Sequence, residues 1–271
     1  MMLILFVLIF LAMVLLNKSK FGNTLKVAVI SSIYKPKNIE TWIELNRKFG
    51  ISHFYINLEN TPELINYLNA QPDVTITIAS PNEKNSYITQ QTRQTQFVTD
   101  SLKVAKHDNI DFIIHIDSDE ILKGDINEIK SLPRDTLNFW MQNYEAVYSK
   151  IPSKSDNCFQ AKRYRDCSTE TCASYINGKG GARIVSELGK IKPFGPHRFV
   201  VSGDQNFGVK LNKVKVLHYE SCDFDNYVSK YQKYAKGADL SKIPFVYYRE
   251  SIENAENLDK LKEIYTKYRV N

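Results

Sequence analysis

The sequence lacks several features that would point to a specialised class of protein. It has no internal repeat and no low-complexity tract, and none of its four cysteines forms the short C-x2-C pair that is typical of zinc knuckles. Basic residues exceed acidic ones by only six, 36 against 30, and they are spread along the chain. No nucleic acid partner is therefore predicted. The weak positive charge fits a soluble surface or attraction of a phosphorylated small molecule.

The cysteines leave two interpretations open. Cys158, Cys167, Cys172 and Cys222 could form two disulfides, in any of three pairings, if the chain folds in an oxidising compartment. They could equally remain free, buried thiols. The sequence does not choose between these alternatives.

The N-terminal stretch from Met1 to Leu16 contains no charge, no glycine and no proline. As a helix it would reach about 24 Å, so it spans a hydrocarbon core of about 30 Å only if Lys18 and Lys20 snorkel at the edge. We predict a single-pass membrane anchor over residues 1–20. A signal peptide is the alternative, although a basic n-region is missing. The lysines that follow indicate a cytosolic body, but the side of the membrane stays open.

The remaining chain, residues 24–271, is predicted to be a single α/β domain. In residues 24–130, β-branched apolar runs alternate with segments of helical periodicity. This rhythm is typical of a doubly wound, Rossmann-like sheet that is mostly parallel and flanked by helices. Strands are predicted over residues 24–34, 52–60, 73–80 and 112–116, and helices over 37–51, 61–70 and 85–109.

The rhythm changes after residue 130. Residues 131–236 are predicted to form a second half that contacts an acceptor, and residues 237–271 a helical tail. The segment 149–181 has the composition of a loop. Strands are predicted over residues 137–148, 181–185, 197–203 and 214–221, and helices over 223–235 and 254–268.

An acidic cluster follows the fourth predicted strand in the stretch DFIIHIDSDEIL, residues 111–122. Ligands of open α/β sheets bind beyond the carboxyl ends of the strands, where Asp117 and Asp119 emerge. Two carboxylates one residue apart can bind one Mg²⁺ or Mn²⁺ together with the oxygens of a diphosphate. Glu120 is predicted to support the turn. The other Asp-x-Asp pair, Asp223 and Asp225, is predicted to cap a helix.

Four segments in this order resemble the family-2-like glycosyltransferases with a GT-A fold, in the group around glycosyltransferase family 92. They are residues 42–60, residues 91–122 with HIDSDEIL, GGARIV followed by PHRF, and VLHYESCDFDNYVSKYQKY. The resemblance covers roughly residues 26–236. It implies a nucleotide-sugar donor, with a UDP-sugar favoured, a divalent metal at the Asp-x-Asp, and a glycan or glycoprotein acceptor. It also implies transfer with inversion at the anomeric carbon.

The resemblance further implies roles for individual residues. His218 is the expected third metal ligand beside Asp117 and Asp119, with His197 as its competitor. Asp117 is also expected to support the donor ribose. The residues expected to bind the rest of the donor are Ser31, Ser32, Tyr34, Glu59 or the nearby Asn57, Gln90 and Arg93.

The acceptor hydroxyl requires a general base on the opposite face of the sugar. Asp204 is the preferred candidate because it follows His197 on a loop between predicted strands. Glu145, Glu220 and Asp156 are the alternatives.

Two other functions are considered. A phosphatase of the haloacid-dehalogenase type also carries Asp-x-Asp, but after its first buried strand, and here the acids follow the fourth. A catalytically inactive, membrane-tethered carbohydrate-binding module would keep the fold without turnover.

Overall fold

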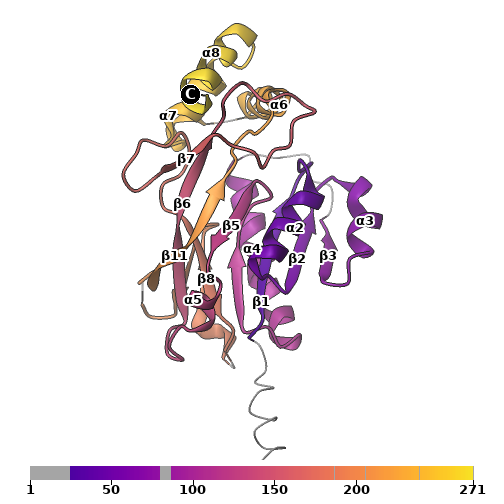
Figure 1. Cartoon of the computed structure of the whole chain (residues 1–271), viewed down its shortest axis with the longest axis vertical. Helices are drawn as coiled ribbons and strands as arrows, with labels where there is room; N and C mark the ends of the chain where they lie inside the picture. Colours follow the sequence, from indigo (N-terminus) through magenta and orange to yellow (C-terminus); the bar gives the residue numbers. More distant parts are fainter. Residues whose placement is uncertain (1–24, 80–86, 186, 205, 238, 271) are drawn as a thin grey trace, which may run out of the picture.

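The computed structural model describes residues 25–79, 87–185, 187–204, 206–237 and 239–270 (Figure 1). The strands are β1 Val27–Ile33, β2 His53–Leu58, β3 Val74–Ile78, β4 Phe112–His115, β5 Glu120–Gly124, β6 Asn138–Val147, β7 Arg163–Asp166, β8 Lys179–Arg183, β9 Ile191–Phe194, β10 Arg198–Val201 and β11 Val209–His218. The helices are α2 Ile39–Phe49, α3 Ile65–Asn69, α4 Tyr87–His107, α5 Asn127–Lys130, α6 Phe224–Ala235, α7 Val246–Glu253 and α8 Leu258–Arg269. Short 3-10 turns cover η1 Pro62–Leu64, η2 Leu188–Lys190 and η3 Leu240–Lys242.

One large sheet organises the described chain. Its strand order is β3-β2-β1-β4-β8-β6-β11-β5, with β7 added beside β6. The strands β3, β2, β1 and β4 run parallel, whereas β8 and β5 are antiparallel to their neighbours. The predicted α/β class with a Rossmann-like sheet flanked by helices is therefore confirmed, although the half beyond β4 is mixed.

The parallel half contains a topological switch point. From β1 the chain moves outward through β2 to β3, and α4 then carries it back to β4 on the other side of β1. The carboxyl ends of β1 and β4 consequently lie side by side with their following loops diverging. Ligands of open α/β sheets bind in this kind of crevice.

Alternating residues of the central strands explain why both faces of the sheet are covered. Val27 and Val29 of β1 belong to one buried cluster with Trp42 of α2. Ala28 and Ile30 belong to a second cluster with helix α4, represented by Val98, Leu102 and Ala105. A strand buried on both faces reads as a continuous apolar run, which is the pattern from which β1 and β4 were predicted.

The second half of the sheet joins distant parts of the chain in a defined register. His218, the last residue of β11, pairs with Glu120 of the antiparallel strand β5 and with Glu145 of the parallel strand β6. The segment predicted as loop, residues 149–181, contains β7 and the start of β8. Strands β5 and β9 were not predicted, because each is only four or five residues long and carries no clear alternation.

Helices α6, α7 and α8 gather at one end of the sheet (Figure 1). Asp223 caps α6 as predicted, since its carboxylate accepts a hydrogen bond of 3.1 Å from the backbone N–H of Asn226. The helices pack through fully buried tyrosines, among them Tyr227, Tyr231 and Tyr247. This bundle holds α6 over the end of the sheet.

All four cysteines form disulfides. Cys158 pairs with Cys222, and Cys167 pairs with Cys172. The first bridge joins the 149–181 segment to the chain that leaves β11. Of the two alternatives from the sequence, the structure contains the disulfides and not the free thiols.

The membrane predictions need correction. The predicted anchor over residues 1–20 lies outside the described residues. Within the described ranges, no helix has the length and apolar character needed to cross a bilayer. This finding contradicts the predicted transmembrane segment and the predicted membrane location.

Candidate functional site

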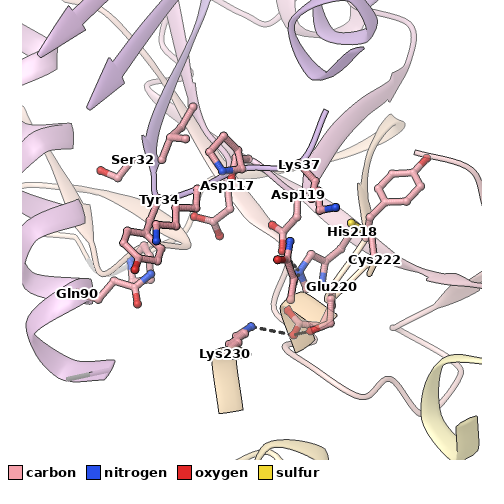
Figure 2. A pocket seen from close by; sticks show the side chains of 18 of the residues that line it. Ser32, Tyr34, Lys37, Gln90, Asp117, Asp119, His218, Glu220, Cys222 and Lys230 are labelled. Atoms are coloured by element: carbon pink, nitrogen blue, oxygen red, sulfur yellow. Dashed lines mark hydrogen bonds and ion pairs between the residues drawn. The ribbon is translucent and has the colours of Figure 1, made fainter. Parts of the chain in front are cut away.

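A cavity of about 570 Å³ opens at the carboxyl end of the parallel strands (Figure 2). Its lining comes from the ends of β1 and β2, the turn after β4, the end of β11 and helices α4 and α6. Eight of the predicted site residues line it, namely Ser32, Tyr34, Glu59, Gln90, Arg93, Asp117, Asp119 and His218. The switch point of the sheet therefore coincides with the site predicted from the acidic cluster.

Asp119, His218 and Glu220 converge in this cavity. His218 Nε2 lies 3.6 Å from Asp119 Oδ2 and 3.7 Å from Glu220 Oε2. One ligand atom from each residue falls within 4.8 Å of the others. The pairing of His218 with Glu120 produces this geometry, because it brings the end of β11 next to the turn that carries Asp119, whose carbonyl accepts a hydrogen bond from the Tyr219 N–H.

The burial of this triad is uneven. The side chain of Asp119 is 37% exposed, while those of His218 and Glu220 are 4% and 2% exposed. Burial acts to lower the pKa of His218, but the carboxylates, Asp119 foremost, raise that pKa above its usual value. The environment thus favours a positive charge at the point where the three side chains meet.

Glu220 is fixed by a network on its far side. Its Oε1 atom lies 2.8 Å from Lys230 Nζ and accepts a hydrogen bond from Ser221, and its Oε2 accepts one of 3.1 Å from the Tyr248 hydroxyl. Burial acts to raise the pKa of Glu220, but the nearby Lys230 outweighs it and lowers the pKa to about 2. Glu220 is therefore an ionised carboxylate whose Oε2 remains directed toward His218.

The donor set fits a hard divalent cation. Carboxylate oxygens with one imidazole nitrogen suit Mn²⁺ or Mg²⁺, and the 37% exposure of Asp119 leaves the position open to the cavity. The predicted ligands Asp119 and His218 are part of this set. Glu220, considered from the sequence only as a base, takes the third place.

Asp117 has a different environment and does not join the triad. Its carboxylate forms an ion pair of 2.5 Å with Lys179 Nζ and accepts a hydrogen bond of 3.1 Å from the Gln94 amide. Burial would raise the pKa of Asp117, but the Lys179 ammonium holds it well below its usual range. The prediction that Asp117 ligates the metal directly is thus replaced by a contact with a protein cation. Figure 2 places Asp117 on the Tyr34 and Gln90 side of the cavity.

Glu120 supports the turn that carries Asp117 and Asp119, as predicted. It is fully buried, accepts a 2.7 Å hydrogen bond from the Asp117 N–H and lies 3.2 Å from Lys179 Nζ. The hydroxyl of Tyr175 also donates to it. Burial raises the pKa of Glu120 despite the nearby lysine.

The residues preferred for binding the donor form one wall of the cavity, with one exception. Glu59 and Arg93 form a two-bond ion pair, at 3.0 and 2.8 Å, that joins β2 to α4. Tyr34 is 40% exposed and its ring carries Lys233 Nζ at 4.1 Å. Ser31 is fully buried inside β1 and does not line the cavity, because it faces the opposite way from Ser32.

The preferred base, Asp204, lies outside the cavity. It is an exposed turn residue whose carboxylate accepts a hydrogen bond of 2.8 Å from the Asn206 N–H. Glu145 is fully buried, and Asp156 accepts a hydrogen bond from Ser153 on a loop. None of these three is among the described residues that line the cavity. The prediction of Asp204 as base is not supported by its position.

His197 lines the cavity but lies apart from the metal triad. Its Nδ1 lies 3.1 Å from the Gly178 carbonyl, and its ring packs on Tyr175 with centroids 4.5 Å apart. Burial, with the Lys179 charge, lowers the pKa of His197 to about 3. His197 is therefore a neutral imidazole in the cavity wall and is not part of the group of Asp119, His218 and Glu220.

Lys179 was not predicted as a site residue, and Glu220 was considered only as a base, although the sequence carried a signal for its place beside His218. In His218-Tyr219-Glu220 the first and third side chains share a side of an extended chain, so Glu220 could have been paired with His218. Lys179 had no such signal. It lies 62 residues from Asp117, and only the pairing of β8 with β4 brings them together.

Comparisons with known proteins add little to this geometry. No protein-family model matches the chain, and no curated protein matches it. Among solved structures, HddC from Yersinia pseudotuberculosis complexed with GMP-PN is 14% identical with a TM-score of 0.37, covering 72% of this chain and 94% of that chain. Rv0371c from Mycobacterium tuberculosis H37Rv is 9% identical with a TM-score of 0.32, covering 46% and 68%. Likenesses this weak carry no argument about function, which has to come from the site itself.

Proposed function

We propose that the protein is a metal-dependent glycosyltransferase that moves a sugar from a nucleoside-diphosphate sugar to an acceptor hydroxyl of a glycan, with inversion at the anomeric carbon. The observation that carries the proposal is the triad of Asp119, His218 and Glu220 at the switch point of a Rossmann-like sheet. The family resemblance of the four sequence segments supplies the reaction class.

The charge around the cavity supports a diphosphate as part of the substrate. Lysines from two directions line it: Lys35 and Lys37 follow β1, and Lys230 and Lys233 belong to α6. Clustered ammonium groups attract and hold phosphate oxygens. The partly exposed ring of Tyr34 offers a flat apolar surface between Lys35 and Lys233, which suits a nucleobase or ribose.

Each part of the site has a defined task in this proposal. A divalent cation bound by the triad would stabilise the negative charge that develops on the departing nucleoside diphosphate. Asp119, His218 and Glu220 would hold that cation, and Lys230 keeps Glu220 ionised. Asp117, kept ionised by Lys179, supports the donor ribose by accepting hydrogen bonds from its hydroxyls.

The proposal is tested by screening UDP-, GDP- and dTDP-sugars against the purified chain, with Mn²⁺ and with EDTA. We expect one nucleotide class to raise the melting temperature only when Mn²⁺ is present, and release of the free nucleoside diphosphate when a glycan acceptor is added. Nucleotide binding of equal strength in EDTA would contradict the metal-dependent reaction.

The two other functions give different results in the same assays. A carbohydrate-binding module would bind glycans without releasing any nucleoside diphosphate. A phosphatase would hydrolyse p-nitrophenyl phosphate, which we expect the protein to leave intact, because no step of the proposed transfer provides a nucleophile for a phosphate ester.

A further inference from the structure

A buried serine connects the proposed metal site to a carboxylate behind it. Ser174 is 2% exposed and lies between two side chains from neighbouring strands. Its Oγ atom is 2.8 Å from Oε1 of Glu145 on β6 and 3.0 Å from Nδ1 of His218 on β11. Glu145 and His218 are register partners in the sheet, so the fold itself sets the spacing that Ser174 bridges.

Glu145 is surrounded by donors and therefore acts as an acceptor. Its two oxygens accept hydrogen bonds from the backbone N–H groups of Ala173 and Ser174, at 2.7 and 3.1 Å. The buried guanidinium of Arg269 lies 3.1 Å from its Oε1, and Arg165 lies 3.9 Å from its Oε2. Backbone N–H groups and two guanidinium groups face the two Glu145 oxygens, and a carboxylate that is surrounded by donors acts as an acceptor toward Ser174.

The direction of the remaining hydrogen bonds follows from the number of available protons. A serine hydroxyl has a single hydrogen, which Ser174 donates to Glu145. His218 must then donate its Nδ1–H to the Ser174 oxygen. The opposite arrangement would turn the Ser174 hydrogen toward His218 and leave two bare oxygens, of Ser174 and Glu145, facing each other at 2.8 Å.

The consequence lies on the other side of the imidazole ring. With Nδ1 protonated, the neutral ring presents the lone pair of Nε2, and this atom is the one that faces Asp119 and Glu220 at 3.6 and 3.7 Å (Figure 2). Metal-binding histidines are commonly fixed in this way by an acceptor at their second nitrogen.

We propose that Ser174, oriented by Glu145, is a positioning residue that holds His218 in its Nδ1–H tautomer and so directs the Nε2 lone pair at the metal position. This inference rests on the proposed function for its purpose, since the metal is the reason for the orientation. It adds two residues, Ser174 and Glu145, that do not line the cavity.

The test compares serine variants that differ in the hydroxyl alone. Ser174→Thr keeps the hydroxyl. Ser174→Val introduces a side chain of nearly the volume of threonine but without the hydroxyl, so the comparison of the two variants separates hydrogen bonding from packing. The dissociation constant for Mn²⁺, measured by calorimetry on the full chain, should rise about 10- to 100-fold in Ser174→Val relative to Ser174→Thr. Ser174→Ala, which adds no bulk, should show the same loss of Mn²⁺ affinity, together with a lower melting temperature, because the buried Glu145 carboxylate loses a hydrogen-bond donor.

A second readout does not depend on metal binding. Nitrogen-15 NMR of the His218 ring at alkaline pH, without metal, distinguishes a protonated nitrogen from a bare one. We expect a protonated Nδ1 and a bare Nε2 in the wild type and in Ser174→Thr. In Ser174→Ala, which lacks the acceptor, we expect a mixture of both tautomers.

The outcomes separate this inference from the proposed function. Equal Mn²⁺ affinity in the Thr and Val variants, or a bare Nδ1 in the wild type, would overturn the role of Ser174 while leaving the enzyme proposal intact. A wild type that binds no Mn²⁺ but shows the protonated Nδ1 would instead contradict the proposed function and keep the assigned tautomer.

Discussion

The two aspartates of the acidic turn are separated by one residue and have opposite surroundings. The charge of Asp117 is compensated within the protein, by Lys179 at 2.5 Å and the Gln94 amide at 3.1 Å. Asp119 faces a second carboxylate, Glu220, across an imidazole, and its side chain is 37% exposed to the cavity. The protein neutralises one carboxylate of the motif with its own lysine and directs the other toward further ligand atoms.

The two aspartates of this Asp-x-Asp motif therefore have different binding partners. A cation binds most strongly where negative charge is concentrated and the protein supplies too few cations of its own. On the Asp117 side a protein cation already occupies the position between two carboxylates, because Lys179 also contacts Glu120. On the Asp119 side, the Lys230 ammonium lies 2.8 Å from Oε1 of Glu220, which is the oxygen that does not face His218. We therefore assign the metal to the second aspartate.

Replacing Asp119 by asparagine is expected to have the largest effect on the transfer rate. Asp119→Asn should lower the rate of Mn²⁺-dependent transfer by about 1,000-fold, the equivalent of about 4 kcal/mol of lost charge stabilisation. Its melting temperature should stay close to that of the wild type, since the side chain is partly exposed. Steady-state kinetics and thermal unfolding on the same samples check both points.

Asp117→Asn is the matched control for that change. It removes one partner of the buried Lys179 and should lower the free energy of unfolding by about 1–3 kcal/mol, while the affinity for Mn²⁺ alone stays within threefold of wild type. If instead Asp117→Asn abolished Mn²⁺ binding and Asp119→Asn did not, the assignment of the two roles would be reversed.

Replacing Lys179 tests the charge compensation around Asp117 from the side of the cation. Lys179→Met leaves Asp117 and the fully buried Glu120 without their shared partner. Breaking a buried ion pair from one side costs about 3–5 kcal/mol, which urea unfolding would register as a lower midpoint. Lys190→Met is the control, because Lys190 is exposed and its ion pair is with the exposed Glu187. Equal stability of both variants would argue against charge compensation by Lys179.

Removing the disulfide near Glu220, on the Asp119 side of the site, should lower the stability by a somewhat smaller amount. The Cys158–Cys222 bridge closes a loop with a sequence separation of 64, and replacing both residues by alanine should cost about 2–5 kcal/mol. The Cys167–Cys172 bridge, with a separation of 5, should contribute less because it constrains a shorter loop. Thermal unfolding of the two double variants ranks them, and the opposite ranking would contradict this reasoning.

The smallest expected effect concerns the cations at the cavity wall. Lys233→Met removes the ammonium over Tyr34 and should weaken the binding of the nucleoside diphosphate about tenfold, or about 1.4 kcal/mol. Lys236→Met changes the charge of the same helix end by the same amount, but Lys236 is exposed and does not line the cavity. Equal losses in both variants would indicate a general charge effect instead of a contact with phosphate.

The predictable part of the fold was the part with local signals. The continuous apolar run around Val27–Ile33 and the helical pattern that ends at Gly50 each report on structure within a few residues of themselves. The acidic turn was located because a buried strand directly precedes it. These patterns arise from burial and from backbone geometry, which the neighbouring sequence largely determines.

The remainder depends on register, which the local sequence does not encode. Asp119 and His218 meet because β5 pairs with β11, and β5 itself has only five residues. The contact of Lys179 with Asp117 requires β8 to pair with β4 across a long stretch of chain. Asp204 was favoured as a base for its place in the sequence, but the hairpin of β9 and β10 carries it away from the cavity.

The most direct test of the metal assignment is a crystal of the wild-type protein soaked in Mn²⁺ and measured for anomalous scattering. We expect one strong anomalous peak within bonding distance of Asp119 Oδ2, His218 Nε2 and Glu220 Oε2, with the Lys179–Asp117 ion pair intact beside it. A peak on the Asp117 carboxylate with Lys179 displaced, or an ordered triad with no peak at saturating Mn²⁺, would contradict the metal assignment.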